Sequence, residues 1–277
     1  FVQEGLAYRI TPFNTKAPER PLYVATTVGS DNYMNLGDNF VQEGLAYRIT
    51  PFNTKAPERP LYVATTVGSD NYMNLGDNFV QEGLAYRITP FNTKAPGAKN
   101  FDTEKVYNNV MNRFKWGGLD KPGLYIDETV MRMCYTHRHL LAQLAMQLIA
   151  EGQNAKAEKV LRKAEKVLPE YNVPYTFMSG AADMARAYAL IGKKADAARI
   201  LNKVWADAKS YADYYLQLTG SRFMMSQNDV LRQLYIMQNI ADITQACDHS
   251  LANQRLKTVN ALYAVYQAKG GAPYDGE

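Results

Sequence analysis

Residues His137–Pro169 read HRHLLAQLAMQLIAEGQNAKAEKVLRKAEKVLP and contain two amphipathic segments separated by a single glycine, Gly152. Apolar residues recur every three or four positions on both sides of this glycine, which is typical of two helices that each bury one face. Small residues at Ala145 and Ala157 allow two antiparallel helices to approach closely, and Pro169 ends the second helix. The stretch therefore predicts a helical hairpin.

The small and large residues of this hairpin have the spacing of a helix-turn-helix repeat of about 34 residues. The stretch resembles a tetratricopeptide repeat, and we expect it to pack through Leu144, Ala145, Leu148, Gly152, Ala157, Leu161, Ala164 and Pro169. A second copy is centred on Gly192, with Lys209 where the terminating proline would stand. Its packing positions are Met184, Ala185, Tyr188, Gly192, Ala197 and Leu201. Two more amphipathic segments, 228–247 and 250–269, fit the template poorly and are expected to cap the array.

The segment Phe1–Asn39 occurs again without change at Phe40–Asn78, and Phe79–Pro96 repeats its first 18 residues. Even solvated positions are identical, which no folding requirement demands. Identity of this kind indicates a recent duplication, an engineered sequence or an error in the recorded sequence. The chain also begins inside a repeat unit and without methionine, so we expect it to be a piece of a longer protein.

One copy of the repeated unit predicts a strand, a helix and a second strand. Leu61–Val67 is rich in β-branched and aromatic residues, and Leu84–Pro90 alternates between apolar and polar residues. Between them, Tyr72–Glu82 carries apolar residues at helical spacing. This connection is long enough for a right-handed crossover, so we expect the two strands to be parallel.

Together these patterns predict a mainly α protein in two parts. Residues 1–96 form a small α/β segment in identical tandem copies, of which 59–96 is the genuine unit. Residues 97–277 form a tetratricopeptide-like array of helical hairpins. Asp102 and Asp127 are placed to cap the first two helices of this second part.

Composition indicates a globular chain with a core, because 47% of its residues are hydrophobic and 21% are charged. The net charge is +4, and lysines stand singly or in pairs on helical stretches, which is typical of a solvated helix face. No apolar run approaches the roughly 20 residues that span a bilayer. We therefore expect no nucleic-acid partner and no membrane span within this chain.

The sequence contains no GxSxG, HExxH or Asp-rich calcium motif. His137 and His139 form the one cluster that could bind a metal, but residues two positions apart on a helix point about 200° apart. Cys134 and Cys247 form no CxxC motif, and we expect each to be a buried free thiol. We therefore expect no catalytic residue, no metal and no cofactor.

Tyrosine is unusually frequent, with 20 residues in the chain. Six of them cluster across the second repeat, namely Tyr171, Tyr175, Tyr188, Tyr211, Tyr214 and Tyr215. They could line a groove that binds a peptide or stacks on a sugar ring. Alternatively, they fill the seams between helix pairs, with each hydroxyl reaching water. The sequence leaves both interpretations open.

Four strings in this order resemble a known family: RPLYVATTVGSDNYMNLGDNFVQEGLAYRITPF, NNVMNRFKWGGL, LYIDETVMRMCYTHRHLLAQL and EKVLPEYNVPY. They are similar to the soluble C-terminal region of bacterial multi-spanning membrane proteins related to protein O-mannosyltransferases and C-type glycosyltransferases. That region is often described only as a domain of unknown function. The resemblance covers residues 59–266 and implies a periplasmic tail tethered to the inner membrane. It carries over no catalytic residue, because the membrane helices that hold the catalytic acid are absent from this sequence.

These observations favour a non-catalytic interaction module: the extracytoplasmic tail of a glycosyltransferase-like membrane protein. It would recognise a protein or peptide in a groove, its own membrane domain among the candidates, and a glycan is a further candidate ligand. Two alternatives stay open. The first is a soluble glycan-processing enzyme domain that uses carboxylates near Tyr171–Tyr215, which requires two carboxylates about 5–10 Å apart in a cleft. The second is a purely structural spacer.

Overall fold

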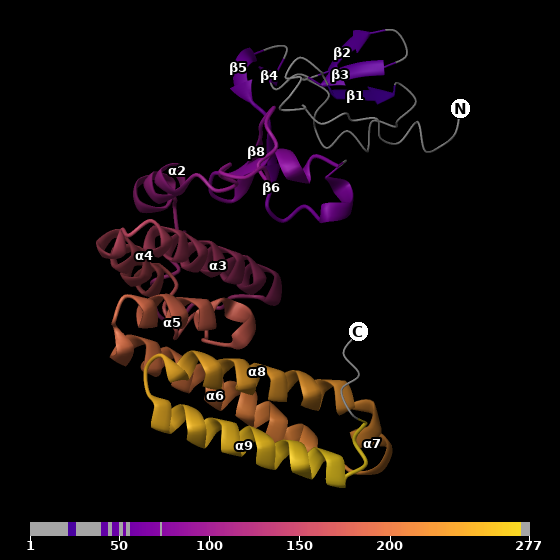
Figure 1. Cartoon of the computed structure of the whole chain (residues 1–277), viewed down its shortest axis with the longest axis vertical. Helices are drawn as coiled ribbons and strands as arrows, with labels where there is room; N and C mark the ends of the chain where they lie inside the picture. The colour runs from indigo at the N-terminus through magenta and orange to yellow at the C-terminus, as the bar shows by residue number, and fades with distance from the viewer. Residues whose placement is uncertain are drawn as a thin grey trace. The chain divides into compact units, whose positions relative to one another are not determined.

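The computed structural model describes residues 22–25, 40–43, 46–49, 52–53, 56–72 and 74–272 (Figure 1). The chain divides into two compact units, Phe1–Arg113 and Phe114–Glu277. Most of the first repeat copy, Phe1–Asn39, lies outside the described residues, which include only its strand Leu22–Ala25.

The first unit contains two three-stranded antiparallel sheets that have the same strand order. One consists of β1 (Leu22–Ala25), β3 (Ala46–Ile49) and β2 (Phe40–Glu43), and the other of β6 (Tyr62–Ala64), β8 (Ala85–Ile88) and β7 (Phe79–Gln81). A short hairpin, β4 (Phe52–Asn53) and β5 (Ala56–Pro60), lies between them in sequence. The register is the same in both sheets, since Tyr23 pairs with Arg48 and Tyr62 with Arg87. Each sheet therefore takes its first strand from one repeat copy and the other two from the next.

The helix expected at Tyr72–Glu82 is wrong. Two single 3₁₀ turns, η3 (Ser69–Asn71) and η4 (Gly76–Asn78), precede β7, and Asn74 between them has a left-handed φ of 61°. A left-handed residue interrupts a helix, and burial then alternates along β7 with the period of a strand. The parallel crossover is also wrong, because β6 and β8 pair antiparallel, and the tight turn at Gly83 joins β7 to β8 as a hairpin.

A short helical segment completes the second sheet. The backbone N–H of Gln81 donates to the Asn100 carbonyl, and that of Asp102 donates to the Gln81 carbonyl. Helix α2 (Thr103–Asn108) follows, capped by Asp102 as predicted, and continues as a π-helical turn, η5 (Asn109–Arg113). The expected domain boundary after Pro96 follows the end of the sequence repeat. The division in space falls after Arg113 because α2 packs back on the sheet.

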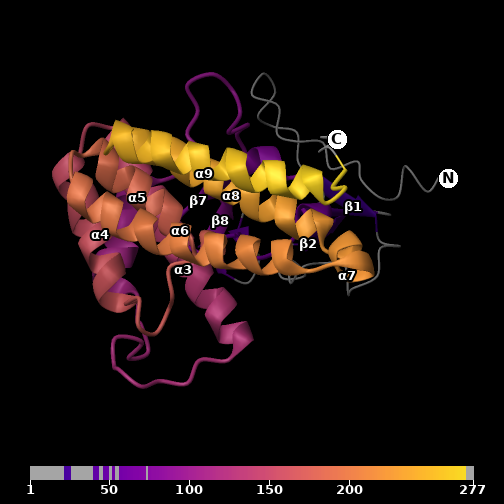
Figure 2. The same cartoon turned by 90° about the horizontal axis from the view of Figure 1, so that it is seen from below.

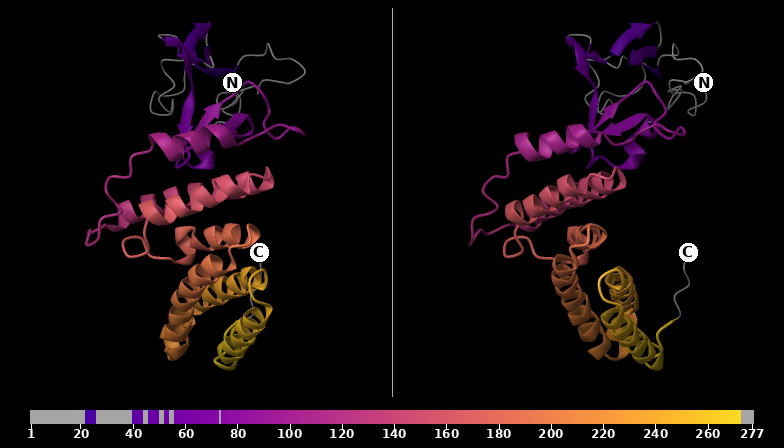
Figure 3. Two further views of the ribbon diagram at one scale, coloured as in Figure 1. Left: turned by 90° about the vertical axis from the view of Figure 1, so that its left-hand side faces the viewer. Right: turned by 60° about the vertical axis from the view of Figure 1, so that its left-hand side comes forward.

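The second unit is an array of helical hairpins, as predicted (Figure 3). Its helices are α3 (Glu128–Ala150), α4 (Asn154–Val167), α5 (Ala181–Leu190), α6 (Lys194–Gln217), α7 (Gly220–Met225), α8 (Gln227–Gln245) and α9 (His249–Ala268), with a 3₁₀ turn, η6 (Phe177–Ser179), before α5. Helix α3 packs against α4 and α5, whereas α8 packs against α6 and α9 (Figure 2). Lys209 does not stop α6 where a proline would, so this helix is long enough to support the third pair. No helix in the described part of the chain has the length and hydropathy of a membrane span.

The two repeat glycines lie in the turns between paired helices. Gly152 and Gly192 have φ of 74° and 78°, and the residue after each donates its N–H to a carbonyl five positions earlier. This is the glycine C-cap that ends a helix and reverses the chain. The predicted packing positions around them are fully buried, namely Leu144, Ala145, Leu148, Ala157, Leu161, Ala164, Met184, Ala185, Tyr188, Ala197 and Leu201.

Ion pairs connect the second helices of the first two hairpins. Arg162 on α4 makes a bidentate pair with Asp196 on α6 at 2.8 and 2.6 Å, and Arg199 lies 2.7 Å from Glu165. Each pair joins residues 34 positions apart, although the two glycines are 40 apart. The connection between α4 and α5 holds the residues in excess of the usual period, and the two helices still come close enough for these pairs to form.

Alanine substitution separates two kinds of glycine in this unit. A Cβ at Gly192 would meet nothing within 4 Å, so Gly192→Ala should cost only the left-handed backbone strain of about 1–2 kcal/mol. Gly180 has φ of 75°, and its Cβ would lie 3.1 Å from the His139 backbone nitrogen. Urea unfolding should therefore show a larger loss of unfolding free energy for Gly180→Ala than for Gly192→Ala. Equal losses would contradict the close approach of α3 to this turn.

Candidate functional site

The six tyrosines of the predicted groove do not share one surface. Tyr175 and Tyr188 are buried in the core, whereas Tyr171 is 63% exposed and donates its hydroxyl hydrogen to the Asp120 carbonyl. The other three, Tyr211, Tyr214 and Tyr215, meet one another near the C-terminal end of α6, with ring centroids 5.3 and 6.5 Å apart. That these side chains bind a partner stays a prediction.

A pocket of about 310 Å³ lies between α5 and α8. Its lining is Arg186, Ala189 and Leu190 on α5, and Asp242, Ile243 and Ala246 at the end of α8. Ile243 is buried, whereas Leu190 is 54% exposed, so the apolar lining is open to solvent. The sequence did not predict this pocket, because its two walls come from different helical hairpins.

The pocket offers charges of both signs beside its apolar lining. Arg186 and Asp242 are both exposed and supply one cation and one anion to the lining. Small residues, Ala189 and Ala246, leave room above the apolar floor. Such a site fits an apolar side chain flanked by polar or charged groups, as in a protein segment.

The two histidines that could have bound a metal contact backbone oxygens instead. Nδ1 of His137 lies 2.7 Å from the Met133 carbonyl oxygen, and Nε2 of His139 lies 3.1 Å from that of Met178. Asp183 on α5 lies 3.7 Å from Nδ1 of His139 and, with this backbone contact, raises the pKa of His139. Within the described part of the chain, no three His, Cys, Asp or Glu side chains gather as metal ligands would.

Carboxylates between Tyr171 and Tyr215 pair with basic side chains. Asp196 accepts from Arg162, and Asp213 lies 2.6 Å from Lys209. The hydrogen bond from Arg162 lowers the pKa of Asp196, which holds that carboxylate in its charged form. Asp207 differs, because burial raises its pKa. The pair of Arg162 and Asp196 joins α4 to α6, whereas Lys209 and Asp213 lie on the same helix. A carboxylate held by a cation is a poor proton donor.

Arg138 on α3 is fully buried and holds the irregular segment after α4. Its guanidinium donates to the carbonyls of Leu168, Val173 and Pro174 at 2.9, 2.6 and 3.1 Å, and it lies 4.9 Å from the Tyr175 ring centroid. Burial lowers the pKa of Arg138 to about 10, so it is still a cation at neutral pH. The backbone carbonyls that follow α4 have no partner within a helix, and the guanidinium supplies the hydrogen bonds that they need.

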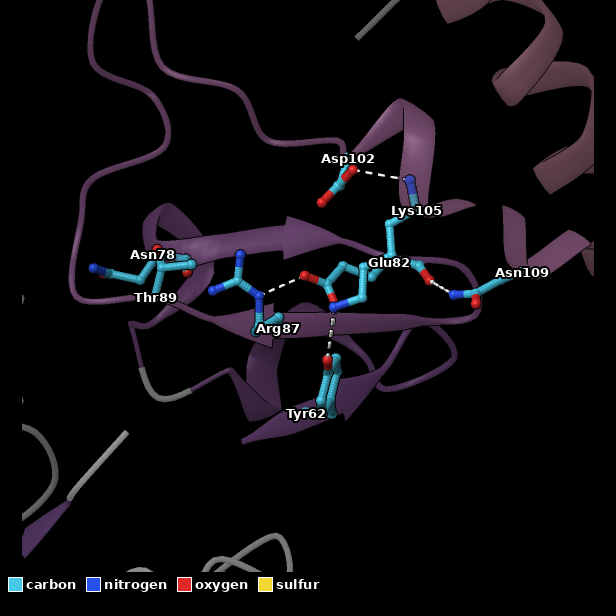
Figure 4. Close-up of polar contacts among 8 residues, drawn as sticks. All are labelled: Tyr62, Asn78, Glu82, Arg87, Thr89, Asp102, Lys105 and Asn109. Carbon is cyan, nitrogen blue, oxygen red and sulfur yellow. Dashed lines mark hydrogen bonds and ion pairs between the residues drawn. The ribbon is translucent and has the colours of Figure 1, made fainter. Parts of the chain in front are cut away.

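In the first unit, a buried carboxylate is surrounded by three polar side chains (Figure 4). The side chain of Glu82, at the end of β7, is 2% exposed. Tyr62 donates to its Oε2 at 2.6 Å, Nε of Arg87 donates to its Oε1 at 2.5 Å, and Nζ of Lys105 lies 2.5 Å from Oε2. Asn109 donates to its backbone carbonyl at 3.0 Å. We call Tyr62, Glu82, Arg87 and Lys105 the Glu82 cluster.

The electrostatics of the Glu82 cluster favour the ion pair. Burial alone would raise the pKa of Glu82, but hydrogen bonds from Lys105, Tyr62 and Arg87 outweigh it, and the pKa lies below its ordinary value of 4.5. Burial would likewise lower the pKa of Lys105, but its contacts with Glu82 and Tyr62 raise it. The cluster therefore ties α2 to all three strands of the sheet by a pair that is charged at neutral pH.

Sequence reasoning missed Glu82, Lys105 and Arg138. A partial signal was present for Arg138, which interrupts the apolar stripe of α3 where a buried charge needs partners. No such signal marks Glu82, because its partners come from a second strand, a third strand and a helix.

Glu82→Gln should destabilise the first unit by an amount that depends on pH. At pH 7 we expect a loss of about 1–3 kcal/mol in the free energy of opening of β7 and β8. Folding lowers the pKa of Glu82 from its ordinary value of 4.5. The stabilisation by its carboxylate is therefore complete above pH 4.5 and is lost as the pH falls through the lowered pKa.

The measurement is hydrogen–deuterium exchange of β7 and β8 in both proteins between pH 3.5 and 7, corrected for the intrinsic exchange rate. The difference between wild type and variant should shrink below pH 4.5. A difference that is absent at pH 7, or that stays constant to pH 3.5, would show that the carboxylate does not hold this sheet.

Part of the first unit matches a known family of domains. Residues 18–58 and residues 55–107 each match the family model described as TMEM260-associated domain 2. No curated protein and no solved structure matches the chain. The two matches fall on the two sheets, and the second match extends into α2. In coarse terms, this agrees with the resemblance to protein O-mannosyltransferase-like proteins. The first unit is therefore similar to two consecutive copies of this domain.

Proposed function

We propose that the second unit is a non-catalytic protein-interaction module. It recognises a segment of a partner protein in the pocket between α5 and α8, and no bond is made or broken. The observation that carries this proposal is the pocket itself, in which apolar Leu190 and Ile243 lie beside Arg186 and Asp242.

The helices that form the pocket support recognition without a large rearrangement. Helices α5 and α8 both pack against α6, which fixes the distance between the two walls. Leu190 is the last residue of α5, just before the turn at Gly192, so its backbone is fixed by the helix. A pre-formed site saves the entropy cost of ordering a binding surface, which favours affinity from a small contact area.

The paired carboxylates also favour binding over chemistry. A glycan-processing site needs one carboxyl group that gives up a proton near neutral pH. Asp196 and Glu165 instead hold two arginines between α4 and α6. These groups stabilise the stack of hairpins on which the pocket is built.

We further propose that the chain is the periplasmic, or extracytoplasmic, part of a glycosyltransferase-like membrane protein. The resemblance over residues 59–266 and the matches to TMEM260-associated domain 2 support this context. In it, the partner segment belongs to an acceptor protein or to the membrane domain of the same protein. The helical unit would then position one of them relative to the other.

Leu190→Lys tests the pocket directly. A random displayed peptide library selected on the full chain should yield peptides whose affinity falls about tenfold or more in this variant, because a lysine charge replaces the apolar wall. Val265→Lys is the matched control, since Val265 is 45% exposed on α9 and is not part of the pocket lining. It should change the affinity by less than about twofold.

Circular dichroism of both variants should match that of the wild type. Selected peptides that bind Leu190→Lys as well as the wild type would rule out the pocket. Failure to enrich any peptide would favour a structural spacer.

A further inference from the structure

The pocket between α5 and α8 contains two charged side chains of opposite sign that do not pair with each other. Arg186 lies on the α5 wall and Asp242 on the α8 wall. In the part of the chain that the structure describes, neither side chain forms a hydrogen bond or an ion pair. Charged side chains elsewhere in the helical unit hold one another, as Arg162 holds Asp196. The pocket therefore leaves one cation and one anion available to a ligand.

Asp242 stands where the helix itself disfavours a negative charge. It lies in the last turn of α8, which ends at Gln245 and contains no basic residue. The carbonyl groups at a helix C-terminus carry a partial negative charge, so an anion in this turn is unfavourable and a nearby cation is favourable. Departures from such local rules are expected at binding sites. A cation supplied by a partner would compensate both Asp242 and the helix end.

The two walls of the pocket have the same layout with opposite charge. Arg186 stands one turn before Leu190, the last residue of α5, and Asp242 stands one turn before Ala246 at the end of α8. Residues four positions apart on a helix share a face. A group bound to either charge therefore lies beside an apolar or small residue of the same wall, and only the sign of the charge distinguishes the two sides.

We propose that the pocket selects a partner segment in which an apolar side chain stands between an acidic side chain and a basic one. The acidic group pairs with Arg186, the apolar side chain packs against Leu190 and Ile243, and a lysine or arginine pairs with Asp242. A segment with its charges exchanged places like charges together on both walls and is rejected. This inference rests on the function proposed above and adds the charge order that the partner carries.

The peptides that the displayed library enriches on the full chain provide the first test. We expect an acidic and a basic residue on opposite sides of an apolar one. One enriched peptide is then synthesised, and its affinity for variants of the chain is measured by isothermal titration calorimetry. Arg186→Glu and Asp242→Lys should each weaken binding about tenfold or more. Reversing the matching charge in the peptide should restore most of each loss, because the pair is complementary again.

Arg222→Glu is the matched control for Arg186→Glu. Arg222 is exposed on α7 and is not part of the pocket lining, and the substitution changes the net charge of the chain by the same amount. It should change the affinity by less than about twofold, because solvent and salt screen a charge outside the contact.

Asp242→Asn separates binding from folding. It removes an anion from the end of α8, so the midpoint of thermal unfolding should stay the same or rise while the affinity for the peptide falls. A lower midpoint together with a lower affinity would show that Asp242 serves the fold, and would overturn the proposal.

The remaining outcomes distinguish the charge order from the pocket itself. Peptides that lose affinity for Leu190→Lys but bind both charge-reversed chains as tightly as the wild type would overturn the charge order alone. So would a loss of affinity that no reversed peptide restores. Peptides that are unaffected by Leu190→Lys, or a library that enriches none, would overturn both.

Discussion

Close contact between helices at fully buried alanines is the constraint on which the second unit depends. Ala145, Ala157, Ala185 and Ala197 have no exposed surface, and each lies within two turns of a glycine that reverses the chain. A methyl group at these positions lets helix axes approach, so larger neighbours such as Leu148 and Leu161 can fill the space around them. This spacing allows the ion pairs between α4 and α6 to form. It also allows Arg138 to reach the backbone carbonyls after α4.

The hairpins could be predicted from the sequence because their determinants are local. Gly152, Gly192 and Asp127 each act on the residues next to them, and their roles follow from backbone geometry alone. The strand at Phe79–Gln81 could not be predicted in the same way. Its apolar residues fit a helical face equally well, and it becomes a strand by pairing with β8, which in turn pairs with β6 much earlier in the chain.

The candidate sites could not be predicted from the sequence. The pocket is formed by residues 186–190 and 242–246, whose proximity depends on both helices packing on the same third helix. The Glu82 cluster joins residues from Tyr62 to Lys105, and a glutamate at the end of a predicted helix gives no sign that it is buried. For Tyr175 and Tyr188 the sequence left a groove and the helix seams both open, because a tyrosine in a helical repeat fills the core as readily as it lines a surface, and the structure buries both.

The two units have different relations to the tandem repeat. In the first unit, the repeat gives two sheets with the same strand order, whereas residues 97–113 occur once. In the second unit, the hairpins share a backbone plan but differ in side chains, and the pocket lies where α5 and α8 both pack against α6.

The contact at the buried alanines is tested most directly by one pair of substitutions on the same helix. Ala157 is fully buried on α4, whereas Ala155, two residues earlier, is exposed, so leucine at either position has the same helix propensity but a different space to occupy. Urea unfolding should show that Ala157→Leu loses about 1–3 kcal/mol or more, while Ala155→Leu stays within about 0.5 kcal/mol of the wild type. Equal stability of the two variants would contradict the close packing from which the rest of the helical unit follows.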